Sequence, residues 1–209
     1  MKVIVFGAHS TVGEHVVKKL HEENVSSCAV IGNENQKELL IKRGATDVVV
    51  YEKGRLETLF TGYEAVIYLT GINPGAATGK TVLVDHESVI EIVKDAQRQG
   101  VQRFVMMSAI TANESAGDAS RDIGAKEMPD ELLRHANLTY TVVQPGALND
   151  KPGEGKISAS ISLESDELEI SREDLAEVLV KVLKIESTFN KTFEVAAGDT
   201  PISDALASL

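Results

Sequence analysis

The segment Gly7–Gly13 carries residue types that bind phosphate without charged side chains. It reads Gly-Ala-His-Ser-Thr-Val-Gly and lies between an apolar run, Val3–Phe6, and a helical pattern. At such a strand–turn–helix junction, the first glycine allows a tight reversal and the last lets the helix pack close to the strand. Unpaired N–H groups at the start of the helix then face a bound anion, and here we expect them from Ser10, Thr11 and Val12. The segment therefore predicts a site for the pyrophosphate of NAD or NADP.

The same turn has a structural alternative. In a flavodoxin-like fold, a glycine-rich turn can connect strand to helix without holding a nucleotide. The position of this turn favours the dinucleotide interpretation, because it lies at the first junction of a long series of alternating apolar and helical segments.

The alternation of short apolar runs and helical patterns predicts the fold class. We expect a doubly wound α/β domain whose mostly parallel sheet has the strand order 3-2-1-4-5-6 and is covered by helices on both faces. The expected strands are Val3–Phe6, Cys28–Ile31, Asp47–Tyr51, Ala65–Leu69, Arg103–Met107 and Tyr140–Val143. The expected helices are Thr11–Glu23, which opens with a capping box at Thr11–Glu14, then Glu34–Arg43, Thr78–Gln99 and Ser120–Ala136.

The pattern changes after the sixth expected strand. Alternating apolar residues at 156–163 indicate a half-buried strand, and we expect residues 145–170 to form a small cap over the carboxyl ends of the strands. Residues 1–209 are predicted to form a single domain. The later expected elements are a helix over Leu175–Ile185 capped at Ser171–Asp174, an additional strand over Lys191–Ala196, and a terminal helix with Thr200 at its cap and Pro201 at its first position.

Composition limits the partners. The formal net charge is −11, and an acidic surface repels nucleic acid and anionic lipid, so neither is an expected partner. Because dinucleotides are also anionic, their binding must come from backbone N–H groups and a helix dipole. No Cys/His/Asp cluster has metal-ligand spacing, so no metal site is expected. Cys28 is the only cysteine and no signal peptide or membrane-spanning run is recognised, so the expected location is the cytoplasm.

Several segments together resemble the atypical short-chain dehydrogenases/reductases, the NmrA-like and NAD(P)-binding group, in the form of its small bacterial members. The turn Gly7–Gly13 is similar to the Gly-Ala-Thr-Gly-x-x-Gly turn of that family. Because the resemblance covers nearly the whole chain, it implies an NAD(P)-binding Rossmann fold with the cofactor between the first and fourth strands. The other matching segments are Ala65–Gly71, Gln102–Ala109, Tyr140–Gly146, Thr192–Val195 and Gly198–Ile202.

The resemblance also implies cofactor-binding residues, with departures that affect cofactor choice. Ser10 stands in place of the middle glycine, where its side chain either crowds the pyrophosphate or hydrogen-bonds to it, and His9 replaces the usual threonine. After the second strand there is neither the arginine that binds a 2′-phosphate nor the acid that binds the ribose, so the choice between NAD and NADP is open. The implied residues are Gly7, Ala8, His9, Ser10, Thr11, Val12, Gly13, Gly32, Asn33, Glu52, Thr70, Gly71, Ser108, Lys126, Pro145 and Gly146.

The catalytic residues of the family are only partly present. Ser108 matches the family's serine and Lys126 its lysine, but Asp122 stands where the family has a tyrosine that protonates a carbonyl. An exposed aspartate is ionised at neutral pH and cannot replace that acid unless its pKa is raised. Each remaining residue has a structural alternative, which is a loop-start cap for Ser108 and a helix-surface charge for Lys126.

Two functions therefore remain open. The first is an NAD(P)-dependent oxidoreductase or epimerase acting on a small molecule, with Ser108 and Lys126 assisting. The second is a non-catalytic NAD(P)-binding redox sensor or regulatory protein. The missing tyrosine favours the second, and the breadth of the resemblance favours the first. A homo-oligomer or a regulatory protein partner is compatible with both.

Overall fold

A computed structural model describes residues 1–51, 58–69, 86–108, 132–164 and 168–209. Within these residues, nine strands form one sheet with the order β11-β8-β10-β6-β5-β4-β1-β2-β3. The central strands are β1 (Lys2–Phe6), β2 (Ser26–Ile31), β3 (Asp47–Val50), β4 (Ala65–Leu69), β5 (Arg103–Met107) and β6 (Thr139–Pro145), and their neighbours all pair in parallel. The predicted order 3-2-1-4-5-6 of a doubly wound fold is confirmed.

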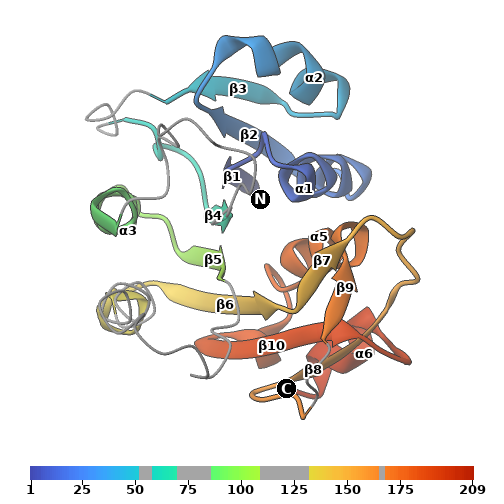
Figure 1. Ribbon diagram of the computed structural model, residues 1–209. Helices are drawn as coiled ribbons and strands as arrows, with labels where there is room; N and C mark the ends of the chain where they lie inside the picture. Colours follow the sequence, from blue (N-terminus) through green and yellow to red (C-terminus); the bar gives the residue numbers. More distant parts are fainter. Residues whose placement is uncertain (52–57, 70–85, 109–131, 165–167) are drawn as a thin grey trace, which may run out of the picture.

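Helices cover the sheet on both faces, as Figure 1 shows. The helices α1 (Thr11–Glu22), α2 (Lys37–Lys42), α5 (Arg172–Lys181) and α6 (Ile202–Ala207) contribute to the core on one face, whereas α3, described from His86 to Arg98, lies on the other. Side chains of β1 alternate between the two cores, with Val3 and Val5 on the first face and Ile4 and Phe6 on the second. Burial on both faces explains why the strands read as continuous apolar runs. None of the described helices is long and apolar enough to cross a lipid bilayer.

Several expected element boundaries are wrong. The second helix is split into a 3-10 turn, η1 (Glu34–Gln36), and α2. The helix after Ser171 begins at Arg172, because the Ser171 hydroxyl accepts a hydrogen bond from the N–H of Asp174, and it ends at Lys181. A short 3-10 turn, η2 (Glu186–Thr188), follows it. Of the helix expected over Ser120–Ala136, only residues 132–135 are described as helical, and the expected start of the third helix at Thr78 lies outside the described residues.

The C-terminal segments extend the main sheet. The additional strand, β10 (Lys191–Ala197), pairs in parallel with β6, and β8 (Lys156–Ser160) pairs antiparallel with β10. Residues 156–160 therefore belong to the main sheet and not to a cap. The strand expected up to residue 163 stops at Ser160, the partner of Glu194, and Ile161 is 78% exposed. The chain turns there because the Glu194 carboxylate accepts the N–H of Leu163 at 2.7 Å.

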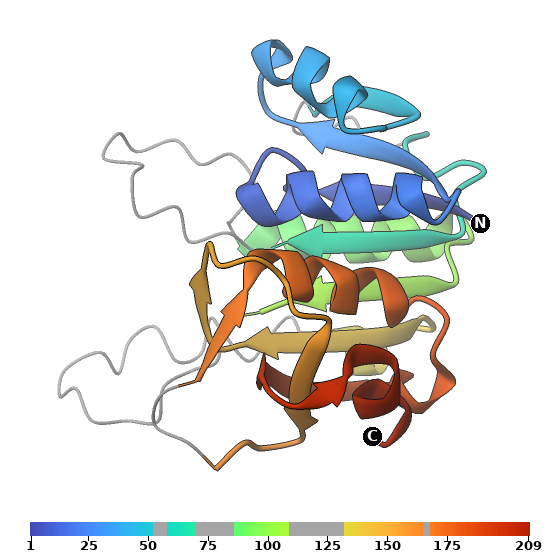
Figure 2. The ribbon, with the colours of Figure 1, turned by 90° about the vertical axis from the view of Figure 1, so that its right-hand side faces the viewer.

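Two short strands form a separate pair. They are β7 (Ala147–Asn149) and β9 (Glu169–Ser171), and Figure 2 shows them at the edge to which the parallel strands point. This pair is the described part of the expected cap that lies outside the main sheet. The prediction of Thr200 and Pro201 as a helix start is wrong, because they form β11 beside β8, and α6 begins at Ile202. Proline is tolerated there because β11 is an edge strand.

Arg103 lies buried at the start of β5, and only 5% of it is exposed. Its guanidinium donates to the carbonyl oxygens of Thr139 at 2.9 Å and Val182 at 2.8 Å, and to the hydroxyl of Thr141. It also lies over the ring of Phe189, 4.5 Å from the ring centroid. One side chain therefore joins β5 and β6 to the end of α5.

We expect Arg103→Met to reduce the free energy of unfolding by about 2–4 kcal/mol, because buried carbonyl groups lose their donor. Arg103→Lys keeps the charge but cannot reach all acceptors at once, so its loss should be intermediate. Urea unfolding measures both. A change below about 0.5 kcal/mol in Arg103→Met would contradict this role.

Candidate functional site

The parallel register brings the sequence-predicted residues to one edge of the sheet. Phe6 of β1 pairs with Tyr68 of β4, Tyr68 with Met106 of β5, and Met106 with Val142 of β6. The residues that follow these positions leave the strands at similar heights. The glycine-rich turn and Ser108 therefore lie along a common carboxyl edge, where open α/β sheets bind their ligands.

Gly7 and Gly13, the two outer glycines of the turn, lie so close to neighbouring backbone that a side chain would not fit at either position. Gly7 has φ +76°, and a Cβ atom there would lie 2.8 Å from the carbonyl oxygen of Leu69. A Cβ atom on Gly13 would lie 2.5 Å from the carbonyl oxygen of Gly7. Both contacts are with backbone and cannot be relieved by a rotamer change. The sequence-based roles of the two glycines, a tight reversal and close helix packing, agree with this geometry.

Ser10 caps α1, and its hydroxyl is used within the turn. The Oγ atom accepts a hydrogen bond from the N–H of Gly13 at 3.0 Å and donates one to the carbonyl oxygen of Gly7 at 2.9 Å. The expected capping box at Thr11–Glu14 is therefore wrong, and Glu14 instead pairs with Arg43 at 3.1 Å. The backbone N–H of Ser10 also donates to Gly7, so its expected role as a free phosphate donor is wrong.

Free donors remain at the turn. The backbone N–H groups of Thr11 and Val12 donate to no acceptor among the described residues. The Nδ1 atom of His9 is buried and has no partner in this part of the structure. Burial lowers the pKa of His9, so the imidazole is neutral at pH 7. The Thr11 and Val12 N–H groups at a helix N-terminus, beside a turn too tight for side chains, fit a dinucleotide pyrophosphate.

The adenosine side of the expected site is open. A Cβ atom on Gly32, which follows β2, would meet nothing within 4 Å. Asn33 is exposed, and its side-chain oxygen accepts the N–H of Asn35 at 3.0 Å, which caps η1. Neither residue presents a charge to a ribose or a phosphate, so contact of Gly32 and Asn33 with the cofactor stays a prediction.

Ser108 and the turn after β6 follow the ends of β5 and β6, on the side where the nicotinamide is expected. The N–H of Ser108 donates to the carbonyl oxygen of Val143 at 2.9 Å, and its half-buried hydroxyl has no partner among the described residues. Pro145 pairs with Val195 of β10. A Cβ atom on Gly146 would lie 2.4 Å from the carbonyl oxygen of Leu168, so the structure gives this glycine a packing role.

Five residues expected at the site lie outside the described residues. They are Glu52, Thr70, Gly71, Asp122 and Lys126. Their roles, including that of Lys126 at the nicotinamide ribose, stay predictions. Among the described residues, no group of three or more His, Cys, Asp or Glu side chains is placed to hold a metal ion.

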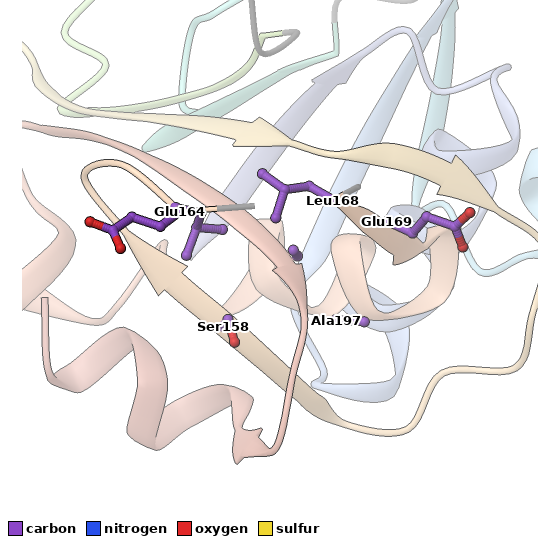
Figure 3. Close-up of a pocket in the computed structure, with 7 residues that line it drawn as sticks. Ser158, Glu164, Leu168, Glu169 and Ala197 are labelled. Carbon is purple, nitrogen blue, oxygen red and sulfur yellow. The ribbon is translucent and has the colours of Figure 1, made fainter. Parts of the chain in front are cut away.

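Sequence reasoning missed a cavity of about 390 Å³ beside β8 and β10. Figure 3 shows its lining, in which Ser158 and Leu168 lie between the side chains of Glu164 and Glu169. Ser158 of β8 and the end of β10 meet in it because these strands pair, and no local pattern encodes that pairing. The lining residues are Ser158, Leu163, Glu164, Leu168, Glu169, Ala196 and Ala197.

Comparisons with known proteins identify relatives that bind NAD(P)H, the type of ligand that the geometry of the turn fits. A family model for NAD(P)H-binding proteins matches residues 7–186. A Bacillus subtilis protein named as an uncharacterized sugar epimerase, YhfK, is 33% identical over all of both chains. A Bacillus halodurans structure, described as a candidate NAD-dependent epimerase/dehydratase, is 32% identical, has a TM-score of 0.87 and covers all of both chains. A short-chain dehydrogenase/reductase from Veillonella parvula, solved with NADP, shares the fold at 15% identity with a TM-score of 0.73, over 96% of each chain.

A pair of substitutions at Ser10 tests the cap. Ser10→Ala should reduce the free energy of unfolding by about 1 kcal/mol, whereas Ser10→Gly should cost only a few tenths, about 0.3 kcal/mol. Because the hydroxyl is used within the turn, Ser10→Gly should bind NAD⁺ or NADP⁺ at least as well as the wild type. Denaturant unfolding and calorimetric titration measure the two effects. Weaker cofactor binding by Ser10→Gly would contradict the assignment and indicate a bond from the hydroxyl to the pyrophosphate.

A second pair tests the close approach at the turn. Gly13→Ala should reduce the free energy of unfolding by about 3 kcal/mol and abolish cofactor binding, because the added methyl group displaces the helix from the turn. Gly32→Ala is the matched control and should change stability by less than about 0.5 kcal/mol. Thermal unfolding and calorimetric titration measure both variants. Wild-type affinity in Gly13→Ala would show that the turn does not hold the cofactor.

Proposed function

Because the chain belongs to the NAD(P)H-binding family, we propose that it is an enzyme that transfers hydride between NAD or NADP and a small molecule. One observation carries the proposal: the glycine-rich turn, the Ser108 hydroxyl, which has no partner among the described residues, and a separate cavity beside the end of β10 all lie along the carboxyl edge of the sheet. A protein that only reports the redox state of a dinucleotide needs the turn but not a second cavity. The cavity therefore supports catalysis.

When bound, NAD or NADP supplies a donor or acceptor of hydride. The chain contributes Thr11 and Val12 N–H groups toward the pyrophosphate and the Ser108 hydroxyl toward the substrate. That hydroxyl is held at the end of β5 by the hydrogen bond of its own N–H to Val143, and it has a donor to offer to a substrate oxygen. Lys126 is proposed to bind the nicotinamide ribose, as the family resemblance implies.

The relatives favour epimerisation over net oxidation or reduction. The relatives at 33% and 32% identity are described as a sugar epimerase and as a candidate epimerase/dehydratase. An epimerase withdraws hydride from one face of a carbon and returns it to the other, so the cofactor is unchanged after a turnover. We propose this reaction as the form of hydride transfer that the chain performs.

The first experiment is calorimetric titration of the protein with NAD⁺, NADH, NADP⁺ and NADPH. We expect micromolar binding of one oxidised and reduced pair. The preferred cofactor is then added with a panel of neutral monosaccharides, while absorbance at 340 nm reports net redox change and NMR spectra report inversion of a carbon. The expected result is inversion without a lasting change at 340 nm, lowered about 100-fold in Ser108→Ala.

The controls separate the candidate functions. Ser108→Ala should lower turnover far more than it lowers cofactor affinity, since the contact proposed for the hydroxyl is with the substrate. A lasting absorbance change would indicate an oxidoreductase in place of an epimerase. Cofactor binding without turnover of any sugar would contradict the enzyme and favour a sensor. Failure to bind all four dinucleotides would overturn the proposal as a whole.

A further inference from the structure

Three polar side chains lie level with one another on neighbouring strands of the sheet. Gln144 of β6 pairs with Glu194 of β10. Met107 of β5 pairs with Val143 of β6, so the next residues, Ser108 and Gln144, are also level. The N–H of Ser108 donates to the carbonyl oxygen of Val143, which continues the parallel ladder beyond the end of β5. Ser108, Gln144 and Glu194 are called the polar row below.

The polar row lies on one face of the sheet. On β5 and β6, the residues two positions before Ser108 and Gln144 are buried in the core that contains α3. On β10, the residues on both sides of Glu194 are buried in the opposite core. Because successive side chains of a strand point to opposite faces, all three members of the row face the side of α3. The residues that define the faces are Met106, Val142, Phe193 and Val195.

Polarity begins at the row on two strands at once. On the same face of β5 and β6, the residues before the row are apolar or aromatic and buried. All three members of the row are half-buried, so each keeps some exposed surface. They come from segments far apart in the sequence and meet at the carboxyl edge, where open α/β sheets bind their ligands. A ligand contact explains this coincidence better than chance polarity at three separate strand ends.

Two members of the row have no structural partner. The Glu194 carboxylate accepts the N–H of Leu163 at 2.7 Å, which holds the turn after β8. The side chains of Ser108 and Gln144 form no hydrogen bond with any other described residue. Hydrogen bonding within the fold thus accounts for Glu194 and leaves the other two available to a ligand.

The chemistry of Ser108 and Gln144 indicates the class of ligand. A hydroxyl can donate and accept a hydrogen bond, and a side-chain amide has two N–H donors and an oxygen acceptor. Since β5 and β6 are adjacent, about 4.8 Å separates their backbones, and the two groups can bond to oxygen atoms on neighbouring carbons of one molecule. The polar row contains no cation that would compensate a phosphate or a carboxylate, and Glu194 adds a negative charge beside Gln144.

The pair lies apart from the pyrophosphate site. β5 is two strands from β1, the strand that ends at the glycine-rich turn, and β6 is three strands from it. At about 4.8 Å a strand, these separations are roughly 10 Å and 14 Å. A small molecule bound by Ser108 and Gln144 therefore leaves the turn free for the dinucleotide.

We propose that Gln144 binds the substrate together with Ser108 and selects neutral molecules with an oxygen atom on each of two neighbouring carbons. Ser108 bonds to the oxygen of the reacting carbon, and the Gln144 amide bonds to the next oxygen. The role of the bound molecule as a substrate rests on the proposed function. Its binding can be measured without turnover.

The test is saturation-transfer NMR on the full chain with both NAD⁺ and NADP⁺ present, and with hydroxyacetone, acetone and pyruvate as probes. Hydroxyacetone has oxygen atoms on two neighbouring carbons, acetone has one oxygen, and pyruvate carries a negative charge. We expect hydroxyacetone to bind about tenfold more tightly than either of the others, as one additional hydrogen bond predicts. Gln144→Leu should weaken hydroxyacetone binding about tenfold and change acetone binding less than about twofold.

Gln102→Leu is the matched control, because Gln102 is exposed and precedes β5 at the opposite edge of the sheet. It should leave all three affinities unchanged. Since the Gln144 amide has no partner in the described structure, Gln144→Leu should keep the thermal unfolding midpoint and the dinucleotide affinity of the wild type. A residue with a structural role would lower the unfolding midpoint.

Several results would overturn the role of Gln144. They are no binding of hydroxyacetone, equal binding of hydroxyacetone and either other probe, wild-type affinity in Gln144→Leu, and a large loss of thermal stability in that variant. Selective binding that disappears in Gln144→Leu, without turnover of any sugar, would sustain the role of Gln144 and contradict the enzyme. Turnover with unchanged kcat and KM in Gln144→Leu would sustain the enzyme and contradict the role of Gln144.

Discussion

The approach of Gly13 to the carbonyl oxygen of Gly7 is the contact on which the site depends. It brings the first turn of α1 against the end of β1, while Gly7 itself lies against the carbonyl oxygen of Leu69 on β4. A side chain at either glycine would separate helix from sheet and move the N–H groups of Thr11 and Val12 away from the edge. The backbone geometry of the turn thus places the helix dipole and two free donors where a pyrophosphate can accept them.

Much of the fold could be predicted because its signals are local. The continuous apolar runs of the central strands follow from burial on both faces, and the glycines at both ends of the turn follow from steric limits. The cap was harder to predict, since both Ser10 and Thr11 are N-cap residue types, Glu14 favours Thr11 as a capping-box partner, and only backbone geometry selects Ser10. In the same turn the N–H of Ser10 donates to the carbonyl oxygen of Gly7, so it cannot also serve as a phosphate donor.

The cavity could not be predicted from sequence for a different reason. Residues 156–160 have the alternation of a strand, but the partner of that strand, β10, begins about 30 residues later. A period-2 pattern gives the two faces of a strand and says nothing about its neighbour. The same limit explains why residues 156–160 were wrongly expected in the cap and why a helix start was wrongly expected at Thr200, since both depend on how β8 joins the sheet.

The net charge of the chain limits how the turn can hold an anionic ligand. With a net charge of −11, the chain cannot attract a dinucleotide through its overall field, and the donors at the turn are neutral backbone groups whose dipoles act only at short range. An anionic cofactor is therefore bound only where its phosphates come into contact with those N–H groups, so the backbone geometry of the turn decides whether it binds at all.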